Sequence, residues 1–344
     1  MITFGFIVHP INLNNVYNFF PPSRIVPPFL INQILTHLPP FKLNHIKGIR
    51  SKTGKEIEGY FILCPLLSKQ ILELDEDFVI NKVLQAGRIA EKLKVNMLGI
   101  GALAGTVGEG ARKIADSLDV PITNGTTYAG CAVIESILKA AEIRNINLAN
   151  SKVAIIGATN SIGKICAYTL SPRVALISLV ARNQERLSDF VDKLKNNGHK
   201  NIEHAGIGVV GALGCADIVI FTTTAVEVSP KIKIENLKQG AIICDIPVPR
   251  NITLDIVKMR PDLLTIDGAA IEPPFNIRLN METGLSPNQI YACMAETMIL
   301  TFEGKFEDFS FGYEPSLKKV EEISTLANKH GFKPAFTSFG KKII

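Results

Sequence analysis

The stretch KVAIIGATNSIGKICAYTL, residues 152–170, constrains the fold of this 344-residue chain more than any other segment. The apolar run from Val153 to Ile156 predicts a buried strand, and a glycine turn and a segment of helical periodicity follow it directly. Glycines let the backbone approach a pyrophosphate, while the start of the helix faces the negative charge. This order of elements therefore predicts a dinucleotide-binding unit.

The turn of this unit supplies most of the predicted cofactor contacts. Gly157 and Gly163 are its outer glycines, and Asn160 occupies the middle position. Asparagine suits that position because it tolerates a positive φ better than most residues. The predicted contacts in the turn are Gly157, Ala158, Thr159, Asn160, Ser161, Ile162 and Gly163.

The end of the next apolar run, residues 175–180, indicates which dinucleotide binds. NAD enzymes commonly place a carboxylate there for the ribose 2′-hydroxyl, whereas this chain has Ala181, Arg182 and Asn183. A guanidinium can hold a 2′-phosphate with two hydrogen bonds. The sequence therefore predicts NADPH, and the alternative is an arginine that is merely exposed at a helix start.

Three further apolar runs, 216–225, 240–249 and 263–270, end in small or polar residues and suggest one ligand-lined edge. Thr222, Thr223 and Gly268 are the predicted cofactor contacts among them. We therefore expect an α/β fold whose centre is a Rossmann-type, doubly wound NADP domain. The expected domains are an N-terminal α/β substrate domain (1–145), the NADP domain (146–275) and a helical C-terminal segment (276–344).

The first 145 residues predict a mixed domain. Residues 2–8 read as a strand, strands flank a turn at Thr53–Gly54, and residues 77–94 have helical periodicity. The Asn- and Pro-rich stretch 11–40 is too interrupted for regular structure over its whole length. Residues 95–104 read as a strand that enters the glycine-rich loop GIGALAG, which we interpret as a substrate-domain loop near the active site.

Composition excludes several classes of protein. The chain is 47% hydrophobic with a net charge of +5, and no Lys/Arg stripe interleaves with aromatic residues, so a nucleic-acid partner is not expected. The six cysteines are scattered, without the spacing of a zinc site or any other predicted metal site. Neither a signal peptide nor a run of transmembrane length is recognisable. These features predict a cytoplasmic protein with free thiols and without stable membrane insertion; the oligomeric state stays open.

One of the cysteines lies in the segment SPNQIYACMAETMILTFEG, residues 286–304. Ser286, Pro287 and Gln289 form the capping pattern of a helix start, and Gly304 predicts its end. Cys293 lies on the apolar stripe of that helix, where a buried core cysteine is the plain interpretation. This start places Cys293 in the second helical turn, beyond the strongest part of the helix dipole.

The motifs GATNSIG, ARNQERL, YACMAETMILTFEG and the closing KHGF at 329–332 resemble the long-chain acyl-[acyl-carrier-protein] reductases best known from cyanobacteria. The resemblance spans essentially the whole chain. It implies NADPH-dependent reduction of a fatty acyl thioester, carried by acyl carrier protein or coenzyme A, to a fatty aldehyde. The catalytic cysteine of the family falls on Cys293, which would form a thioester intermediate.

Three other residues are candidates for the chemistry. His9 matches the family's early G-x-I-x-H pattern, and it either supports the thiolate or caps a loop. Glu296 either orients a base or faces solvent. Tyr128 lies with Thr126 and Thr127 in NGTTYAG, where these residues hydrogen-bond the substrate carbonyl or, in the interpretation that we favour for Thr126, cap a helix.

Three features depart from the cyanobacterial pattern: Asn160 in the phosphate turn, the absence of a histidine at Thr126–Thr127, and the stretch 11–40. Two other functions therefore stay open. A dehydrogenase of the shikimate type would reduce a small carbonyl directly and would not need Cys293. A redox-inactive protein would bind NADPH or acyl groups without turnover.

Overall fold

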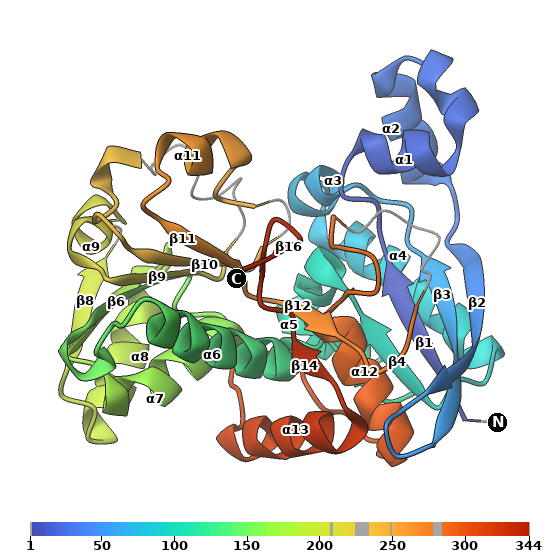
Figure 1. Ribbon diagram of the computed structural model, residues 1–344. Helices are drawn as coiled ribbons and strands as arrows, with labels where there is room; N and C mark the ends of the chain where they lie inside the picture. Colours follow the sequence, from blue (N-terminus) through green and yellow to red (C-terminus); the bar gives the residue numbers. More distant parts are fainter. Residues whose placement is uncertain (1, 207–208, 224–233, 248–249, 278–283, 344) are drawn as a thin grey trace. The chain divides into compact units, whose positions relative to one another are not determined.

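The computed structural model describes residues 2–206, 209–223, 234–247, 250–277 and 284–343 (Figure 1). Contacts between residues divide the chain into two compact units. Unit 1 contains residues 1–128, 271–312 and 321–333, and unit 2 contains residues 129–270, 313–320 and 334–344. The first division falls at Tyr128, inside helix α6 (Thr126–Ile143), whereas the boundary expected from the sequence lies near residue 145.

Unit 1 is built on a five-stranded sheet of order β2-β3-β1-β4-β5. Its strands are β1 (Thr3–Val8), β2 (Phe41–Arg50), β3 (Glu56–Leu63), β4 (Met97–Ile100) and β5 (Ile122–Thr123). The strands β2 and β3 form the predicted hairpin, and the other neighbouring strands run parallel. The register pairs Ile7 with both Ile62 and Ile100, so β1 and β4 end at the same edge of the sheet.

Helices complete unit 1, and several of those that follow β3 bury the apolar side chains of the sheet. They are α1 (Leu13–Phe19), η1 (Pro21–Ile25), α2 (Pro28–His37), α3 (Ser68–Glu73), α4 (Glu76–Lys92), η2 (Ala102–Gly105), α5 (Val107–Ala115), α12 (Ala292–Glu303) and most of α13 (Leu317–His330). The periodicity predicted for residues 77–94 is realised by α4, whose Val79, Val83 and Ala86 are buried in the core beside β1 and β4. The Pro-rich stretch 11–40 forms three short helices, since each proline cluster ends one helix or starts the next.

Unit 2 contains a six-stranded parallel sheet of order β11-β10-β9-β6-β7-β8. Its strands are β6 (Lys152–Ile156), β7 (Leu176–Val180), β8 (Ile202–Gly206), β9 (Ile218–Phe221), β10 (Ile242–Asp245) and β11 (Leu264–Asp267). The strand order reverses between β6 and β9, which is the switch point at which doubly wound sheets bind dinucleotides. The predicted Rossmann-type fold is confirmed.

Helices cover both faces of this sheet (Figure 1). Side chains of α6, α7 (Ser161–Leu170) and α8 (Gln184–Asn196) pack on the face that contains Val153 and Ile155. Side chains of α9 (Val209–Cys215) and α11 (Leu254–Met259) pack on the opposite face, with Ala154 and Ile156. The alternation along β6 explains why its sequence is a continuous apolar run, because both of its faces are buried.

The remaining elements are short. They are η3 (Leu148–Asn150), η4 (Ser171–Arg173), η6 (Ile234–Asn236), the hairpin of β15 (Thr337–Ser338) and β16 (Lys341–Lys342), and a three-stranded sheet of β13 (Ile290–Tyr291), β12 (Ala270–Glu272) and β14 (Lys333–Pro334). The C-terminal residues from 276 are therefore not wholly helical. They are also shared between the two units rather than forming a segment of their own.

The helix that contains Cys293 begins later than the sequence predicts. Ser286 is not its N-cap: α12 starts at Ala292, and Tyr291 is the cap residue. Ser286 and Gln289 do exchange hydrogen bonds, but within a turn where Asn288 has φ 65°. Ile290 and Tyr291 are extended in β13, so strand pairing overrides the local capping signal. Gly304 ends the helix in the left-handed conformation, as predicted.

Candidate active site

The phosphate turn of unit 2 depends on its two outer glycines. Gly157 has φ 94°, and a β-carbon there would lie 2.5 Å from the Thr222 hydroxyl oxygen. A β-carbon at Gly163 would lie 2.6 Å from the Gly157 carbonyl oxygen. Ala158, Thr159, Ser161 and Ile162 complete the connection from β6 to α7. The turn is thus a close-packed backbone cradle at a helix start, which fits a pyrophosphate.

Asn160 has a different role from the one that the sequence suggests. Its φ is −85°, so it does not occupy the left-handed region. Its side-chain oxygen accepts a hydrogen bond from the Gly163 N–H at 2.9 Å and caps α7, while its Nδ2 donates to the carbonyl and hydroxyl oxygens of Thr222. Asn160 therefore replaces a middle glycine by bracing the turn against the neighbouring strand.

The predicted ribose-binding end lies directly after β7. Ala181 is buried and Arg182 is exposed. The Asn183 side chain accepts a hydrogen bond from the Arg186 N–H at 2.9 Å, so it caps α8. Of the three predicted residues, Arg182 is the one that presents a charged group at this strand end. Its exposure is compatible with a bound 2′-phosphate.

The other predicted cofactor residues support the turn. The Thr222 hydroxyl donates toward the carbonyl oxygens of Ile156 and Gly157, at 3.0 and 2.9 Å, and so its side chain holds the turn together. The Thr223 carbonyl accepts a hydrogen bond from Asn251 Nδ2. A β-carbon at Gly268 would lie 2.5 Å from Cys244 Sγ. The remainder of the predicted 216–225 and 240–249 runs, Thr224, Ala225 and residues 248–249, lies outside the described residues.

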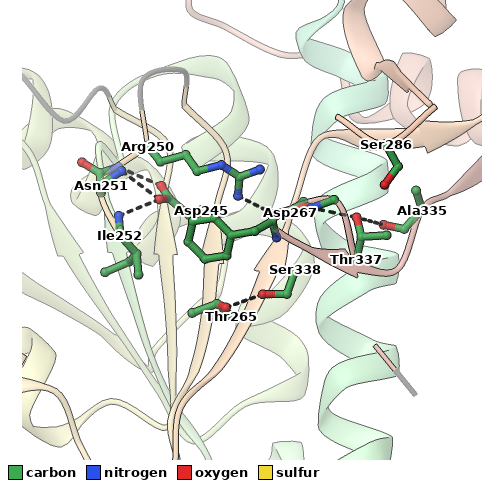
Figure 2. Close-up of polar contacts among 12 residues, drawn as sticks. Asp245, Arg250, Asn251, Ile252, Thr265, Asp267, Ser286, Ala335, Thr337 and Ser338 are labelled. Atoms are coloured by element: carbon green, nitrogen blue, oxygen red, sulfur yellow. Dashed lines mark hydrogen bonds and ion pairs between the residues drawn. The ribbon is translucent and has the colours of Figure 1, made fainter. Parts of the chain in front are cut away.

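Two carboxylates at the carboxyl ends of β10 and β11 form a polar network that sequence reasoning did not foresee (Figure 2). Asp245 accepts hydrogen bonds from the N–H groups of Asn251 and Ile252, at 2.8 and 2.9 Å. Asp267 pairs with Arg250 and accepts hydrogen bonds from Thr337, Phe339 and Gly340. The only signal in the sequence was an aspartate at the end of each strand. Both carboxylates are used to hold loops rather than left for a ligand.

Cys293 lies at the start of a helix in unit 1. It is the second residue of α12, in the first turn rather than the second, and the helix has no side-chain cap. The first N–H groups of such a helix lack intrahelical acceptors. Burial raises the pKa of Cys293 to about 11, whereas hydrogen bonds from the backbone of Ala102 and Met294 act in the opposite direction. Cys293 is half-buried, and backbone groups of its own helix and of the loop after β4 therefore oppose the effect of burial on its pKa.

Ala102 was missed because an alanine in a glycine-rich loop carries no chemical signal of its own. It follows β4 and has φ 49°, an unusual value for a residue with a β-carbon. A hydrogen bond from its backbone acts to lower the pKa of Cys293. The interpretation of GIGALAG as a loop near the cysteine found the region but not the residue or its role.

Glycines allow the backbone to pack closely around Cys293. A β-carbon at Gly125, where φ is 78°, would lie 2.0 Å from the Cys293 Cα. A β-carbon at Gly99 would lie 2.1 Å from the Thr297 hydroxyl oxygen, and that hydroxyl donates to the Cys293 carbonyl at 2.9 Å. The first turn of α12 is thus held between the end of β4 and the start of α6.

Glu296 does not face solvent. It is fully buried and accepts hydrogen bonds from the Thr123 hydroxyl and, at 2.6 Å, from the Tyr128 N–H. Because Tyr128 is the third residue of α6, the carboxylate also lies at the positive end of that helix. Its negative charge contributes to the raised pKa of Cys293. Glu296 therefore joins the cysteine-bearing turn to the start of α6.

The NGTTYAG segment forms the start of α6. Thr126 is the first helical residue, not its cap; its N–H and its hydroxyl donate to the Asn124 side chain, at 3.2 and 2.9 Å. The Thr127 hydroxyl accepts from Ser310. The Tyr128 side chain is buried, and its backbone N–H binds Glu296. These contacts give the segment a structural role that the sequence left open.

His9 lies just beyond β1, at the sheet edge where Ala102 follows β4. Its Nδ1 donates to the Pro10 carbonyl at 3.2 Å, and its Nε2 is buried without a hydrogen-bond partner among the described residues. Burial lowers the pKa of His9 to about 4. At neutral pH, His9 is therefore an uncharged imidazole with a lone pair on Nε2.

Two kinds of feature are absent from the described residues. Among the described residues, no cluster of three or more His, Cys, Asp or Glu side chains is arranged to hold a metal ion. No helix in that same part of the chain is long and apolar enough to cross a membrane.

Similarity to known proteins points to nicotinamide chemistry. The shikimate/quinate 5-dehydrogenase family matches residues 139–268. Long-chain acyl-[acyl-carrier-protein] reductase of Synechococcus elongatus is 27% identical over 303 residues, which are 83% of this chain and 85% of that protein. The chain is an NAD(P)-dependent oxidoreductase. The predicted cofactor of this oxidoreductase, NADPH, agrees with the Rossmann-type sheet, the phosphate turn and the family match, and is confirmed.

The chain is also similar to part of a longer protein and to several solved structures. The aminotransferase PigE of Serratia sp. is 28% identical over 318 residues, which cover 89% of this chain and 36% of that protein, so the oxidoreductase spans about a third of PigE. Among solved structures, quinate dehydrogenase from Corynebacterium glutamicum with NAD covers 94% of this chain and 98% of its own, at 14% identity and a TM-score of 0.41. L-tryptophan dehydrogenase from Nostoc punctiforme covers 97% and 81%, at 13% identity and a TM-score of 0.42.

Proposed function

We propose that this oxidoreductase reduces a fatty acyl thioester to a fatty aldehyde, with Cys293 as the acyl acceptor and NADPH as the reductant. The observation that carries the proposal is the place of Cys293 in the first turn of α12, where the helix N–H groups lack intrahelical acceptors. The positive end of a helix stabilises a thiolate, and hydrogen bonds from the Ala102 and Met294 backbone act on the pKa of Cys293 in the same direction.

The resting site contains a neutral thiol and a neutral imidazole, because burial raises the pKa of Cys293 to about 11 and lowers that of His9 to about 4. Acyl transfer must therefore include movement of the thiol proton. The sulfur bonds to the acyl carbon, the bond to the carrier's sulfur breaks, and the proton ends on the departing thiol. We assign His9 Nε2 as the relay for this proton, since its lone pair is not used by another described residue.

The carbonyl oxygen becomes negatively charged during acyl transfer. The N–H groups of Ala102 and Met294 are suited to stabilise that charge, as they stabilise negative charge on the sulfur. When bound, NADPH supplies a hydride. The carbon–sulfur bond to Cys293 then breaks, the aldehyde leaves, and the sulfur recovers a proton. Glu296 and Tyr128 hold the first turn of α12 throughout and do not contact the acyl group in this proposal.

The acyl donor is acyl carrier protein or acyl-coenzyme A, both of which present the acyl group on a pantetheine thiol. Support for the donor comes from the similarity to the reductase of Synechococcus elongatus. We place the reaction in the cytoplasm, where the free cysteines of the chain stay reduced.

Intact mass after mixing with a long-chain acyl thioester, in the absence of NADPH, tests the proposal. We expect a mass gain of one acyl group on the wild type, and aldehyde release when NADPH is added. Cys293→Ala should gain no mass, whereas Cys215→Ala, which removes an exposed cysteine, should behave like the wild type. An adduct that persists in Cys293→Ala would contradict the proposal.

The match to the shikimate/quinate 5-dehydrogenase family favours a second candidate, direct reduction of a small carbonyl. That match covers residues 139–268 and thus the dinucleotide unit rather than the segment with Cys293. Under this alternative, Cys293→Ala keeps its activity on a small hydroxy- or keto-acid, and the wild type forms no acyl adduct.

A further inference from the structure

The helices between β1 and β2 form a feature that the proposed reaction does not use. Residues 11–40, which we call the helical appendage, contain α1, η1 and α2 and project beyond one end of the unit 1 sheet (Figure 1, dark blue). Proline starts both η1 and α2. Because proline restricts the backbone, the two breaks in the appendage are bends of defined conformation.

One face of α2 fixes the appendage to unit 1. Ile31 and Leu35 are buried against Leu67. Gln70 Nε2 donates to the Asn32 carbonyl at 2.9 Å, and Lys82 Nζ donates to the Leu38 carbonyl at 2.8 Å. These contacts lie on one side of α2 and at its end, so they determine which side of the helix is turned outward.

The outward side is apolar as well. Phe29, Leu30 and Ile34 are 62%, 38% and 56% exposed, and Ile25 of η1 is 88% exposed. At the end of α1, Phe19 and Phe20 are exposed by more than half. Six of the fourteen large apolar side chains that are exposed among the described residues therefore lie within 16 consecutive positions. Such a concentration marks an interaction surface rather than scattered apolar residues.

Charge indicates the nature of the partner. The first acidic residue of the chain is Glu56, and six Lys or Arg side chains precede it. Since the net charge of the whole chain is +5, its positive excess comes entirely from this N-terminal part. Within the appendage, Arg24 is the one Lys or Arg, and it is exposed on η1 between the two apolar groups. Exposed Phe, Ile and Leu side chains beside a cation, in a stretch without any acidic residue, are typical of segments that enter an anionic lipid interface.

The lengths of the helices determine whether they could cross a bilayer or only lie on its surface. The α1 and α2 helices contain 7 and 10 residues, which is too short to cross a bilayer. We propose that the helical appendage docks this protein on the surface of an anionic phospholipid bilayer, with Phe19, Phe20, Ile25, Phe29, Leu30 and Ile34 entering the boundary between headgroups and acyl chains. The proposal does not depend on the reaction assigned to Cys293.

Tryptophan fluorescence tests the docking directly, because the chain contains no tryptophan. Phe29→Trp places a single reporter on the outward side of α2, and Met259→Trp places one on the exposed part of α11 as a control. With vesicles of phosphatidylglycerol and phosphatidylcholine, we expect a blue shift for Phe29→Trp and quenching by brominated lipid. The Met259→Trp emission should stay unchanged. Absence of a shift at Phe29→Trp, or an equal shift at both positions, would overturn the proposal.

Vesicle sedimentation of the full chain supplies the second test. The double variant Phe29→Asp/Ile34→Asp should lose about tenfold or more in vesicle binding. The matched variant Leu254→Asp/Met259→Asp, which changes exposed side chains of α11, should bind like the wild type. Wild-type binding should weaken on vesicles of phosphatidylcholine alone and at high salt.

Two results would assign the surface to a protein instead. If the wild type does not bind vesicles but forms a dimer, and Phe29→Asp/Ile34→Asp is monomeric, the surface joins two copies of this chain. If that variant instead loses binding to purified acyl carrier protein, the surface receives an acidic protein. Either result overturns bilayer docking.

Discussion

At the scale of single residues, side-chain chemistry suggests which roles Cys293 and the groups around it could have. Their positions in the fold determine which of these roles are possible. The segment alone suggested a buried core cysteine, and the family resemblance made Cys293 a candidate nucleophile. Its donors were not recognisable, because Ala102 and Met294 act through backbone N–H groups, which every residue except proline has. Glu296 was seen as a nearby carboxylate, but only the folded chain shows that it is buried against Thr123 and Tyr128.

The charge of Glu296 leads to a prediction about thiol reactivity. Glu296→Gln removes a negative charge that raises the pKa of Cys293, so that pKa should fall. Below the thiol pKa, alkylation follows the thiolate fraction, and we expect iodoacetamide to react with Cys293 about threefold or more faster at pH 8. Rates are measured by intact mass against Glu303→Gln, which changes a carboxylate at the other end of α12. A slower reaction in Glu296→Gln would refute the electrostatic role.

Arg182 is predicted to select the cofactor. Arg182→Ala should weaken NADPH binding by about tenfold or more and leave NADH binding nearly unchanged, since the predicted partner of the guanidinium is the 2′-phosphate, which NADH lacks. Titration of cofactor fluorescence gives both affinities. The control is Arg186→Ala, which removes an exposed arginine from the first turn of α8. Equal losses of affinity for NADPH and NADH would show that the Arg182 charge attracts both cofactors and does not recognise the 2′-phosphate.

At the scale of elements, close approach of backbones decides where Cys293 lies. The start of α6 and the first turn of α12 meet at Gly125, and α12 meets β4 at Gly99. Both glycines are visible in the sequence, but their partners are more than 150 residues away. The sequence shows that a glycine is present, but only the fold shows which atoms lie close to it.

Gly125→Ala tests this approach. A β-carbon there would overlap the Cys293 backbone, and φ 78° adds strain of about 1–2 kcal/mol. Gly54→Ala is the matched control because Gly54 has φ 84° with nothing within 4 Å. We expect Gly54→Ala to show the strain alone, whereas Gly125→Ala is less stable and loses acylation. Thermal unfolding and intact mass provide the two measurements. Similar stabilities and full acylation in both variants would argue against tight packing at Gly125.

The pairing of α12 with α13 predicts a pH dependence. Hydrogen bonds from Lys329 and His330 lower the pKa of Glu303. A carboxylate with a lowered folded-state pKa stabilises the fold above its unfolded pKa and loses this contribution as the pH falls. Glu303→Gln should therefore destabilise the protein by at most about 1 kcal/mol at pH 7 and by little at pH 3. Urea unfolding at both pH values measures the difference. A cost that persists at pH 3 would indicate packing rather than charge.

At the scale of the whole molecule, the two units differ in how far local sequence specifies them. In unit 2, continuous apolar strands, a glycine turn and amphipathic helices follow one another along the chain, so the Rossmann-type fold was predictable. Both units combine three stretches of the chain, but the Rossmann-type sheet of unit 2 lies within one of them, whereas unit 1 takes its sheet from residues 1–128 and α12 from residues 271–312. Its α12 was predicted to start at Pro287 because the capping signal is local, but pairing of Ile290 and Tyr291 in β13 delays the start to Ala292.

A family resemblance singled out Cys293 as the candidate nucleophile, and the sequence by itself determined the parallel dinucleotide sheet, the phosphate turn and the arginine after β7. These depend on periodicity, glycine and side-chain chemistry, all of which are local. Tertiary structure alone decided that Cys293 lies in the first turn of its helix and that the Ala102 and Met294 backbone acts on its pKa. It likewise decided that the side chains of Asn160 and Glu296 hydrogen-bond to neighbouring segments of the chain. It also decided which side of the helical appendage is exposed. Backbone direction and burial come from contacts between distant segments, and no local pattern encodes them.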